Sequence, residues 1–198
     1  MPGKINDLEV LLKKNGALRV RELENLGFPR TYLSELAKRG KAVRQERGIY
    51  THPDCDIPNH FSYALACSKV PRGVVCLLSA LLYHEIGTQS PHEVWMAIDR
   101  KARIPKIDYP SVRFVRFSGP ALSEGIEEIE GPYPFKIYNP AKTVADCFKY
   151  RNKIGVDVAV EALKDGWRER KFRMDKLSYY ARICRVYNVM APYLESIL

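Results

Sequence analysis

Several common features are missing from this sequence. It has no run of 18 uncharged apolar residues, so no membrane-spanning helix is predicted. The opening stretch MPGKINDLEV lacks the apolar segment of a signal peptide, and we therefore expect a cytoplasmic protein. No internal repeat and no low-complexity tract is found. These absences favour a globular protein of 198 residues, long enough for two units of unequal size.

Paired cysteines and recognised metal-ligand spacings are absent too. The five cysteines show neither CxxC spacing nor a disulfide framework; they are Cys55, Cys67, Cys76, Cys147 and Cys184. All but the first stand in apolar stretches, where a free thiol behaves as a small hydrophobic side chain. His52, Cys55 and His60 are metal-ligating types without a recognised spacing. We predict structural thiols, no metal and no cofactor.

Motifs for nucleotide binding and hydrolysis are also lacking. Lys142 and Thr143 would close a phosphate-binding loop, but residues 135–141 contain no glycine to surround a phosphate. Ser79 and His84 lack the G-x-S-x-G elbow that would make them part of a hydrolase. We therefore predict no catalytic residues.

One enzymatic alternative stays open. Asp99 and Lys101 form a D-x-K triplet after an expected strand, and an earlier carboxylate, Glu85 or Glu93, could complete a Mg²⁺ site beside the lysine. Such a site would make the protein a nuclease. Triplets of this kind arise easily by chance when 28% of the residues are charged.

Positive charge is abundant and unevenly distributed. The chain holds 32 Lys and Arg against 23 Asp and Glu, a net charge of +9. Residues 1–50 alone hold 11 basic against 6 acidic residues. This excess favours an anionic partner, either nucleic acid or an acidic protein.

The first 50 residues have the pattern of a winged helix-turn-helix. Apolar residues at helical spacing predict a first helix that ends at Asn15-Gly16, a short second helix over 19–27 and a third over 29–40 with Leu33 and Leu36 buried. Two short strands, 42–44 and 48–51, follow as a basic hairpin. This order of elements predicts a DNA-binding domain over residues 1–55.

The outward positions of the third helix and the hairpin carry groups that reach phosphates and base edges. The candidate DNA-binding residues are Arg19, Arg21, Arg30, Thr31, Tyr32, Ser34, Lys38, Arg39, Arg44, Gln45 and Arg47. Basic residues on a helix are usually only solvated surface, and many winged helices bind protein. A protein-interaction module without DNA binding is therefore the other alternative.

Residues 56–198 are expected to form a mixed α+β domain. Strand-like alternation is found in 93–100, 111–119, 124–131 and 133–140, and the proline and glycine spacing suggests short hairpins rather than long crossovers. After Asn139, which is predicted to cap a helix that starts at Pro140, three helical segments follow: 140–154, 156–170 and 174–197. The fold class is thus α+β with a helical end.

This helical end is strongly cationic. Lys142 is expected in the first turn of a helix, where the helix dipole disfavours a cation, so that it either has an acidic partner or marks a contact surface. Six cations of this helical end form a candidate contact surface: Lys142, Lys149, Arg151, Lys153, Arg182 and Arg185.

Three stretches resemble the AbiEi family of abortive-infection antitoxins, which are transcriptional regulators of type IV toxin–antitoxin systems. They are GVVCLLSALLYHEIGTQSPHEVWMAI, YNPAKTVADCFKYRNKIGVDVAVEAL and RICRVYNVMAPYLE, and the likeness extends over nearly the whole chain after Ile5. The resemblance implies an N-terminal winged helix that represses the antitoxin–toxin operon, and a C-terminal domain that neutralises a nucleotidyltransferase toxin. The six cations of the contact surface are therefore called the candidate antitoxin surface.

The resemblance also bears on the partners. We expect binding to double-stranded promoter DNA at an inverted repeat, by a pair of monomers that assembles on the DNA or by a dimer. In type IV systems the antitoxin opposes the toxin without a stable complex, which puts a docking role for the cationic helices in doubt. Some relatives carry a nuclease-like C-terminal domain, and here only Asp99-x-Lys101 is left of that pattern. No catalytic residue can be transferred.

Overall fold

The protein is described by a computed structural model over residues 2–15, 17–20, 23–46, 48–54, 60–107, 109–131, 133–195 and 197. The chain divides into two compact units, Met1–Phe61 and Ser62–Leu198, which are described separately. The predicted boundary between residues 55 and 56 lies in 55–59, outside the described residues. No helix within the described ranges combines the length and the apolar character needed to cross a membrane.

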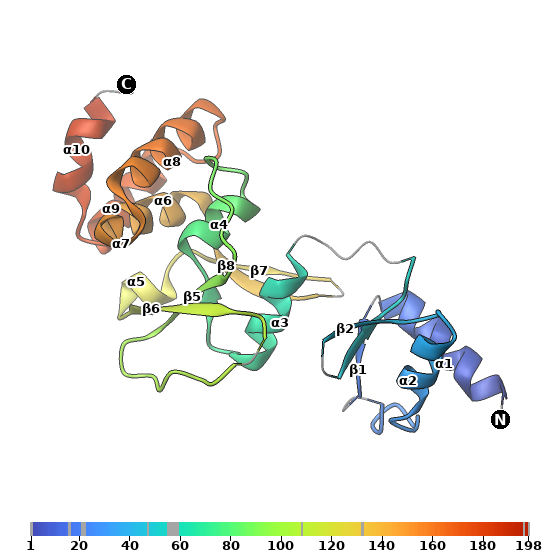
Figure 1. The fold of residues 1–198 in the computed structure, drawn as a ribbon. Helices are drawn as coiled ribbons and strands as arrows, with labels where there is room; N and C mark the ends of the chain where they lie inside the picture. The colour runs from blue at the N-terminus through green and yellow to red at the C-terminus, as the bar shows by residue number, and fades with distance from the viewer. Residues whose placement is uncertain are drawn as a thin grey trace. The chain divides into compact units, whose positions relative to one another are not determined.

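The N-terminal unit combines helices with a small antiparallel sheet (Figure 1). The strand order is β1-β3-β2. In chain order its elements are α1 (Pro2–Asn15), β1 (Ala17–Arg19), α2 (Tyr32–Lys38), β2 (Val43–Glu46) and β3 (Ile49–Thr51). A helix followed by a two-stranded hairpin, with an earlier strand added to the sheet, fits a winged helix.

The core of this unit follows the apolar periodicity of the sequence. Leu8 and Leu12 of α1 are fully buried against Leu33 and Leu36 of α2, and Tyr50 of β3 joins the same cluster. Residues four apart on a helix lie on one face, so each helix directs two leucines toward the other. The predicted inward face of α2 is therefore confirmed.

The second helix predicted over residues 19–27 is wrong in part. Arg19 belongs to β1 and pairs with Ile49 of β3, and residues 23–27 form turns closed by the Phe28 N–H to Leu23 C=O hydrogen bond of 2.8 Å. Arg21 and Glu22 lie outside the described residues. Pairing with a strand distant in sequence overrides a local helical pattern here because it satisfies backbone groups.

The C-terminal unit contains a five-stranded mixed sheet and most of the helices (Figure 1). The strand order is β6-β5-β4-β8-β7. Its elements are α3 (Phe61–Lys69), β4 (Val74–Val75), α4 (Leu77–Tyr83), β5 (Val94–Asp99), β6 (Val112–Phe117), α5 (Pro120–Ser123), β7 (Ile126–Ile129), β8 (Phe135–Tyr138), α6 (Pro140–Lys149), α7 (Arg151–Ile154), α8 (Val156–Arg168), α9 (Met174–Ile183) and α10 (Tyr187–Glu195).

The strands were predicted in the right places, but their pairing is not the expected series of hairpins. β7 and β8 do form an antiparallel hairpin, whereas β5 runs parallel to β6 and β4 runs parallel to β8. Parallel neighbours need a crossover connection, which residues 100–111 supply between β5 and β6, with no helix in the described parts 100–107 and 109–111. The α+β class predicted from the sequence is confirmed.

Both faces of the sheet are covered. Alternate residues of β5 point to opposite sides, with Met96 and Ile98 against α3, and Trp95 and Ala97 in the cluster formed with α4, α6, α8 and α9. Figure 1 shows α3 on one side of the sheet and α4, α6 and α8 on the other. A strand buried on both faces reads as a continuous apolar run, which explains the stretch VWMAI.

The helical end departs from the prediction at one point. Residues 174–197 were expected as a single helix, but α9 ends at Ile183 and α10 begins at Tyr187. Arg185 has a φ of 60°, in the left-handed region that ends a helix. The Val186 N–H closes the turn on the Ala181 C=O at 2.8 Å.

The connection from α8 to α9 is anchored by one aromatic ring. Phe172 is buried against Gly166 of α8, and a Cβ at position 166 would lie 2.4 Å from Cε1 of the ring. Arg170, with a φ of 55°, reverses the chain, and the Lys171 N–H bonds the Gly166 C=O at 2.9 Å. Only glycine leaves room for the ring at this contact.

We expect Gly166→Ala to destabilise the C-terminal unit by about 1–3 kcal/mol, because the added methyl group overpacks the Phe172 contact. Urea unfolding followed by tryptophan fluorescence measures this unit alone, since Trp95 and Trp167 are the only tryptophans. Lys164→Ala, an exposed position on the same helix, is the control and should change stability by less than about 0.5 kcal/mol. Equal stability of Gly166→Ala and the natural protein would contradict the proposed contact.

Candidate nucleic-acid interface

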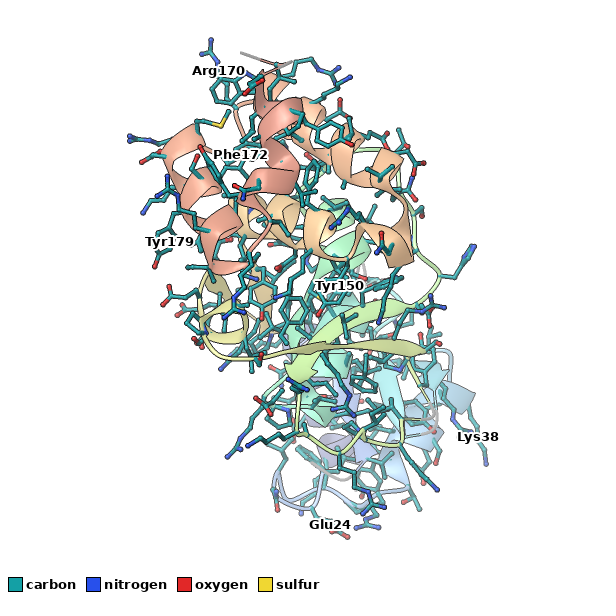
Figure 2. The ribbon with its side chains drawn as sticks, turned by 90° about the vertical axis from the view of Figure 1, so that its left-hand side faces the viewer. Glu24, Lys38, Tyr150, Arg170, Phe172 and Tyr179 are labelled. Atoms are coloured by element: carbon teal, nitrogen blue, oxygen red, sulfur yellow. The ribbon has the colours of Figure 1, made fainter. Side chains whose placement is uncertain are left out.

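The surface of α2 and the turn before it carries the described part of the predicted DNA-binding set. Arg30 and Thr31 precede the helix, Lys38 ends it and Arg39 caps it, and all four are exposed. Lys38 projects from the helix into solvent (Figure 2). Neither Lys38 nor Arg39 makes an ion pair with any residue in the described part of the chain. Both cations are therefore available to phosphate.

Arg30 differs because it already has a partner. Its Nε lies 2.8 Å from Glu24 Oε1 and its Nη2 lies 3.0 Å from Glu24 Oε2. This two-pronged geometry is the one an arginine uses on a phosphate or on the edge of guanine. Arg30 has to exchange Glu24 for DNA in order to bind there.

Two other members of the set are less exposed than predicted. Tyr32 is half-buried and packs against the leucine core of the N-terminal unit, so its ring has a structural role. The Ser34 hydroxyl donates to the Thr31 C=O at 2.6 Å, within the first turn of α2. Their hydroxyl oxygens can still accept hydrogen bonds from a partner.

The predicted contacts on the hairpin are only partly described. Arg44 is exposed on β2 and Arg19 belongs to β1, with its backbone alone described. Gln45 belongs to β2, likewise with an undescribed side chain, and Arg21 and Arg47 lie outside the described residues.

The first member of the candidate antitoxin surface is not on the surface. Lys142 is 0% exposed, and its Nζ lies 2.6 Å from Asp146 Oδ2, one turn further along α6. The same Nζ lies 4.1 Å from the centre of the Tyr138 ring and 5.0 Å from that of Phe117. The prediction of a contact surface is wrong here, and the alternative prediction of an acidic partner is confirmed.

Local backbone features hold Lys142 in the interior. Asn139 caps α6 by accepting the Lys142 N–H at 2.9 Å, and Pro140 fills the first helical position. Gly125 lies against the stem of the lysine, where a Cβ would approach Lys142 Cβ to 2.8 Å. Its φ of 78° also favours glycine.

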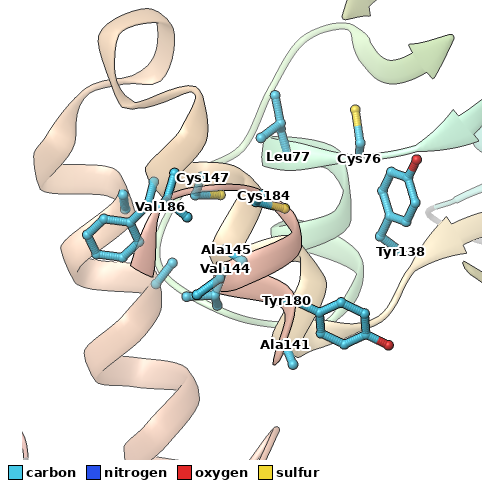
Figure 3. Close-up of a cluster of buried hydrophobic side chains, with 14 of the residues drawn as sticks. Cys76, Leu77, Tyr138, Ala141, Val144, Ala145, Cys147, Tyr180, Cys184 and Val186 are labelled. Atoms are coloured by element: carbon cyan, nitrogen blue, oxygen red, sulfur yellow. The ribbon is translucent and has the colours of Figure 1, made fainter. Parts of the chain in front are cut away.

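Asp146 is fully buried, and its neighbours in the chain, Ala145 and Cys147, belong to the apolar cluster shown in Figure 3. Burial raises the pKa of the Asp146 carboxyl, and the charge of Lys142 together with its hydrogen bond partly offsets that rise. The Cys184 thiol donates to Asp146 Oδ1 at 3.2 Å. Burial, followed by the nearby carboxylate, raises the pKa of Cys184 to about 12, so this thiol is protonated and unreactive.

The other thiols that the structure describes are buried as well. Cys67, Cys76, Cys147 and Cys184 are free and buried, as predicted, while Cys55 lies outside the described residues. Burial is the largest cause that raises the pKa of Cys67, Cys76 and Cys147. These cysteines fill the core.

The remaining cations of the candidate surface are divided between exposed and half-buried positions. Lys153, Arg182 and Arg185 are exposed. Lys149 and Arg151 are half-buried, the first 5.7 Å above the Phe117 ring and the second bonded to the Phe148 C=O at 2.9 Å. Arg182 stacks on Tyr187, 5.0 Å from the ring centre. Because α9 ends at Ile183, Arg182 and Arg185 do not share one helix face.

The residues of the enzymatic alternatives are not brought together. Asp99 Oδ1 accepts the Lys101 N–H at 2.8 Å, and Glu93 pairs with Arg113 at 2.6 Å. Among the described residues, no group of three or more His, Cys, Asp and Glu side chains could hold a metal ion. His84 Nε2 lies 2.7 Å from the Tyr138 C=O, and Ser79 Oγ accepts the Trp95 N–H at 2.9 Å. Both side chains therefore link α4 to the sheet.

Sequence reasoning missed two sets of residues. Asp146 could have been found, since it follows Lys142 by four positions, the spacing at which oppositely charged helical side chains pair. Lys176 and Tyr180 were not singled out, because only the fold brings α9 to the start of α6, where Tyr180 Oη accepts from Asn139 Nδ2 at 3.0 Å.

Comparison with protein families gives one match. Residues 8–53 match the family described as "Transcriptional regulator, AbiEi antitoxin". The match covers the N-terminal unit from α1 to just beyond β3, and it confirms the resemblance inferred from the sequence. The three stretches on which that resemblance was based, 73–98, 138–163 and 182–195, lie outside the matched range. No curated protein matches the chain.

The buried ion pair supports a stability prediction. We expect Asp146→Asn to destabilise the C-terminal unit by about 3–5 kcal/mol, because it leaves Lys142 charged and uncompensated in the interior. The double variant Lys142→Met with Asp146→Asn should recover most of that loss, since neither charge is then buried. Urea unfolding followed by tryptophan fluorescence is the measurement, and additive losses in the double variant would show that the two residues do not interact.

Proposed function

We propose that this protein is the antitoxin of a type IV toxin–antitoxin system, because residues 8–53 match the AbiEi antitoxin family of transcriptional regulators. The N-terminal winged helix binds promoter DNA and represses the operon that encodes antitoxin and toxin. The C-terminal unit counteracts a nucleotidyltransferase toxin. The observation that carries the proposal is the family match over a unit in which Lys38 and Arg39, at the end of α2, are exposed and pair with no residue that the structure describes.

The chemistry of α2 favours DNA over a protein partner. Lys38 and Arg39 lie at the C-terminal end of the helix and add two charges that a phosphate backbone can neutralise. Arg30 and Thr31 lie at the other end, where a recognition helix contacts base edges. We assign phosphate contacts to Lys38 and Arg39, and base readout to Arg30.

In this proposal the hairpin of β2 and β3, which is the wing of the winged helix, adds contacts to the DNA backbone. Arg44 on β2 is exposed and continues the positive surface beyond α2. Arg19, Arg21, Gln45 and Arg47 stay in the proposed set as flanking contacts. Operator binding uses two monomers on an inverted repeat, which would double the number of neutralised phosphates.

The C-terminal unit acts on the toxin system without catalysis in this proposal. Its exposed cations, Lys153, Arg182 and Arg185, form the remaining antitoxin surface together with half-buried Lys149 and Arg151. No stable complex with the toxin is required. The action takes place in the cytoplasm, where the promoter is found.

We expect Lys38→Ala and Arg39→Ala each to weaken binding to the promoter and to random DNA by similar factors, because each removes one phosphate contact. Each should also lower the slope of log affinity against log salt by about 1. Fluorescence anisotropy of the full chain on both DNAs, at several salt concentrations, measures these effects. Lys164→Ala, which removes the same charge from the C-terminal unit, is the matched control.

Arg30→Ala should instead reduce the preference for the promoter over random DNA, by roughly 1–3 kcal/mol if it reads a guanine. Glu24→Gln frees Arg30 and should strengthen DNA binding, and this gain should shrink when Arg30 is also replaced by alanine. Equal effects of Arg30→Ala on both DNAs would remove the base-readout assignment. No preference of the natural protein for its own promoter would favour the protein-interaction alternative.

A further inference from the structure

A cavity of about 310 Å³ lies in the C-terminal unit, apart from the buried ion pair and from the winged helix. It is bounded by the first turn of α6, by β7 and by the segment that joins α8 to α9. Its volume is at the lower end of the range of about 300–1,000 Å³ that is usual for small-molecule sites. The cavity therefore has room for one small ligand.

The walls of this cavity carry three cations. Lys171, Arg173 and Lys176 line it, against one carboxylate, Glu127. The segment from residue 168 to 176 that supplies them holds five Lys and Arg and two acidic residues. The cavity is thus a concentration of positive charge that favours an anionic ligand.

These cations are held loosely by the protein itself. Lys171 is 27% exposed and lies 3.6 Å from Glu85 Oε2 and 3.8 Å from Glu169 Oε2, distances too long for hydrogen bonds. Arg173 Nε lies 3.1 Å from Asp175 Oδ1 on the surface. Lys176 has no ion pair with any residue that the structure describes. An anion that enters the cavity can therefore form ion pairs with these three side chains.

Backbone and side-chain donors lie on the same walls. In the first turn of α6, Pro140 has no N–H, and Asn139 Oδ1 accepts the Lys142 N–H. The Ala141 N–H has no intrahelical acceptor and no side-chain cap, and Ala141 lines the cavity. A helix start of this kind favours a negatively charged group.

Tyr180 supplies a second donor. Only 9% of its surface is exposed, it lines the cavity, and its hydroxyl oxygen accepts from Asn139 Nδ2 at 3.0 Å. Its own proton is therefore left for an acceptor inside the cavity. Tyr180 and Ala141 lie next to each other at the edge of the buried cluster in Figure 3.

The backbone of the segment that joins α8 to α9 is held in place by the buried ring of Phe172. Its ring is packed against Gly166, so that the residues on either side, Lys171 and Arg173, are held at the rim. Figure 2 shows Phe172 among the helices, with Arg170 at the outer end of the loop. A site formed before its ligand arrives loses less entropy on binding.

We propose that this cavity binds a phosphate-bearing small molecule of mononucleotide size. The phosphate accepts hydrogen bonds from the Ala141 N–H and the Tyr180 hydroxyl and is neutralised by Lys171, Arg173 and Lys176. Glu127 accepts from a hydroxyl or amino group on the rest of the ligand. This site goes beyond the proposed antitoxin function and does not depend on DNA binding.

Isothermal titration calorimetry of the full chain with AMP, CMP, GMP and UMP tests the proposal. At least one nucleotide should bind, while the matching nucleoside, which lacks the phosphate, should not. Lys176→Ala and the double variant Lys171→Ala with Arg173→Ala should each weaken binding roughly tenfold or more, and Tyr180→Phe, which keeps the ring, by a few-fold to tenfold. Lys164→Ala is the matched control and should bind as the natural protein does.

Three results would overturn the proposal: absence of binding by all four nucleotides, equal weakening by the Lys164→Ala control, or equal affinity for inorganic phosphate and for the best nucleotide. Binding of a short RNA with no binding of mononucleotides would also overturn it in favour of a polynucleotide surface. Urea unfolding followed by tryptophan fluorescence shows whether each variant is folded. Promoter binding measured on the same variants should be unchanged, which separates failure of this site from failure of the repressor function.

Discussion

The ion pair between Lys142 and Asp146 organises the C-terminal unit, because two charges without exposure to water tolerate few arrangements. Each needs its partner at hydrogen-bond distance and polarisable groups around it. The lysine finds these in the rings of Tyr138 and Phe117, and the carboxylate in the thiol of Cys184. The pair thereby joins α6 to strands β6 and β8 and to the end of α9.

The cavity proposed as a phosphate site depends on the same helix. Asn139 caps α6 with one atom and contacts Tyr180 with another, so the start of α6 and the middle of α9 are held together. The buried pair is one turn deeper, and Gly125 allows its lysine to pass close to the strand connection. The buried ion pair therefore helps to fix the start of α6 relative to the middle of α9, and these two segments are walls of the cavity.

Sequence reasoning was most reliable where one apolar face decides the structure. The helix α2, the strands β5 to β8 and the capped start of α6 were all predicted close to their observed positions. It failed where contacts distant in sequence decide, as in the pairing of Arg19 with β3 and in the parallel pairing of β5 with β6. The position of Lys142 was predicted wrongly for a similar reason. Its cap and its spacing to Asp146 are local, but its burial depends on Phe117, Tyr138 and Gly125.

If the N-terminal unit binds DNA as we propose, the ion pair between Arg30 and Glu24 affects how the protein discriminates between DNA sequences. Any DNA must displace Glu24 before it gains the arginine, so the penalty falls equally on correct and incorrect sequences. Guanine offers two well-aligned acceptors in the major groove, so that Arg30 can replace both of the hydrogen bonds that it loses from Glu24. The other bases do not offer such a pair. The internal carboxylate thus acts as a competitor that shortens the stay on incorrect sequences, and discrimination is obtained by weakening the wrong complexes.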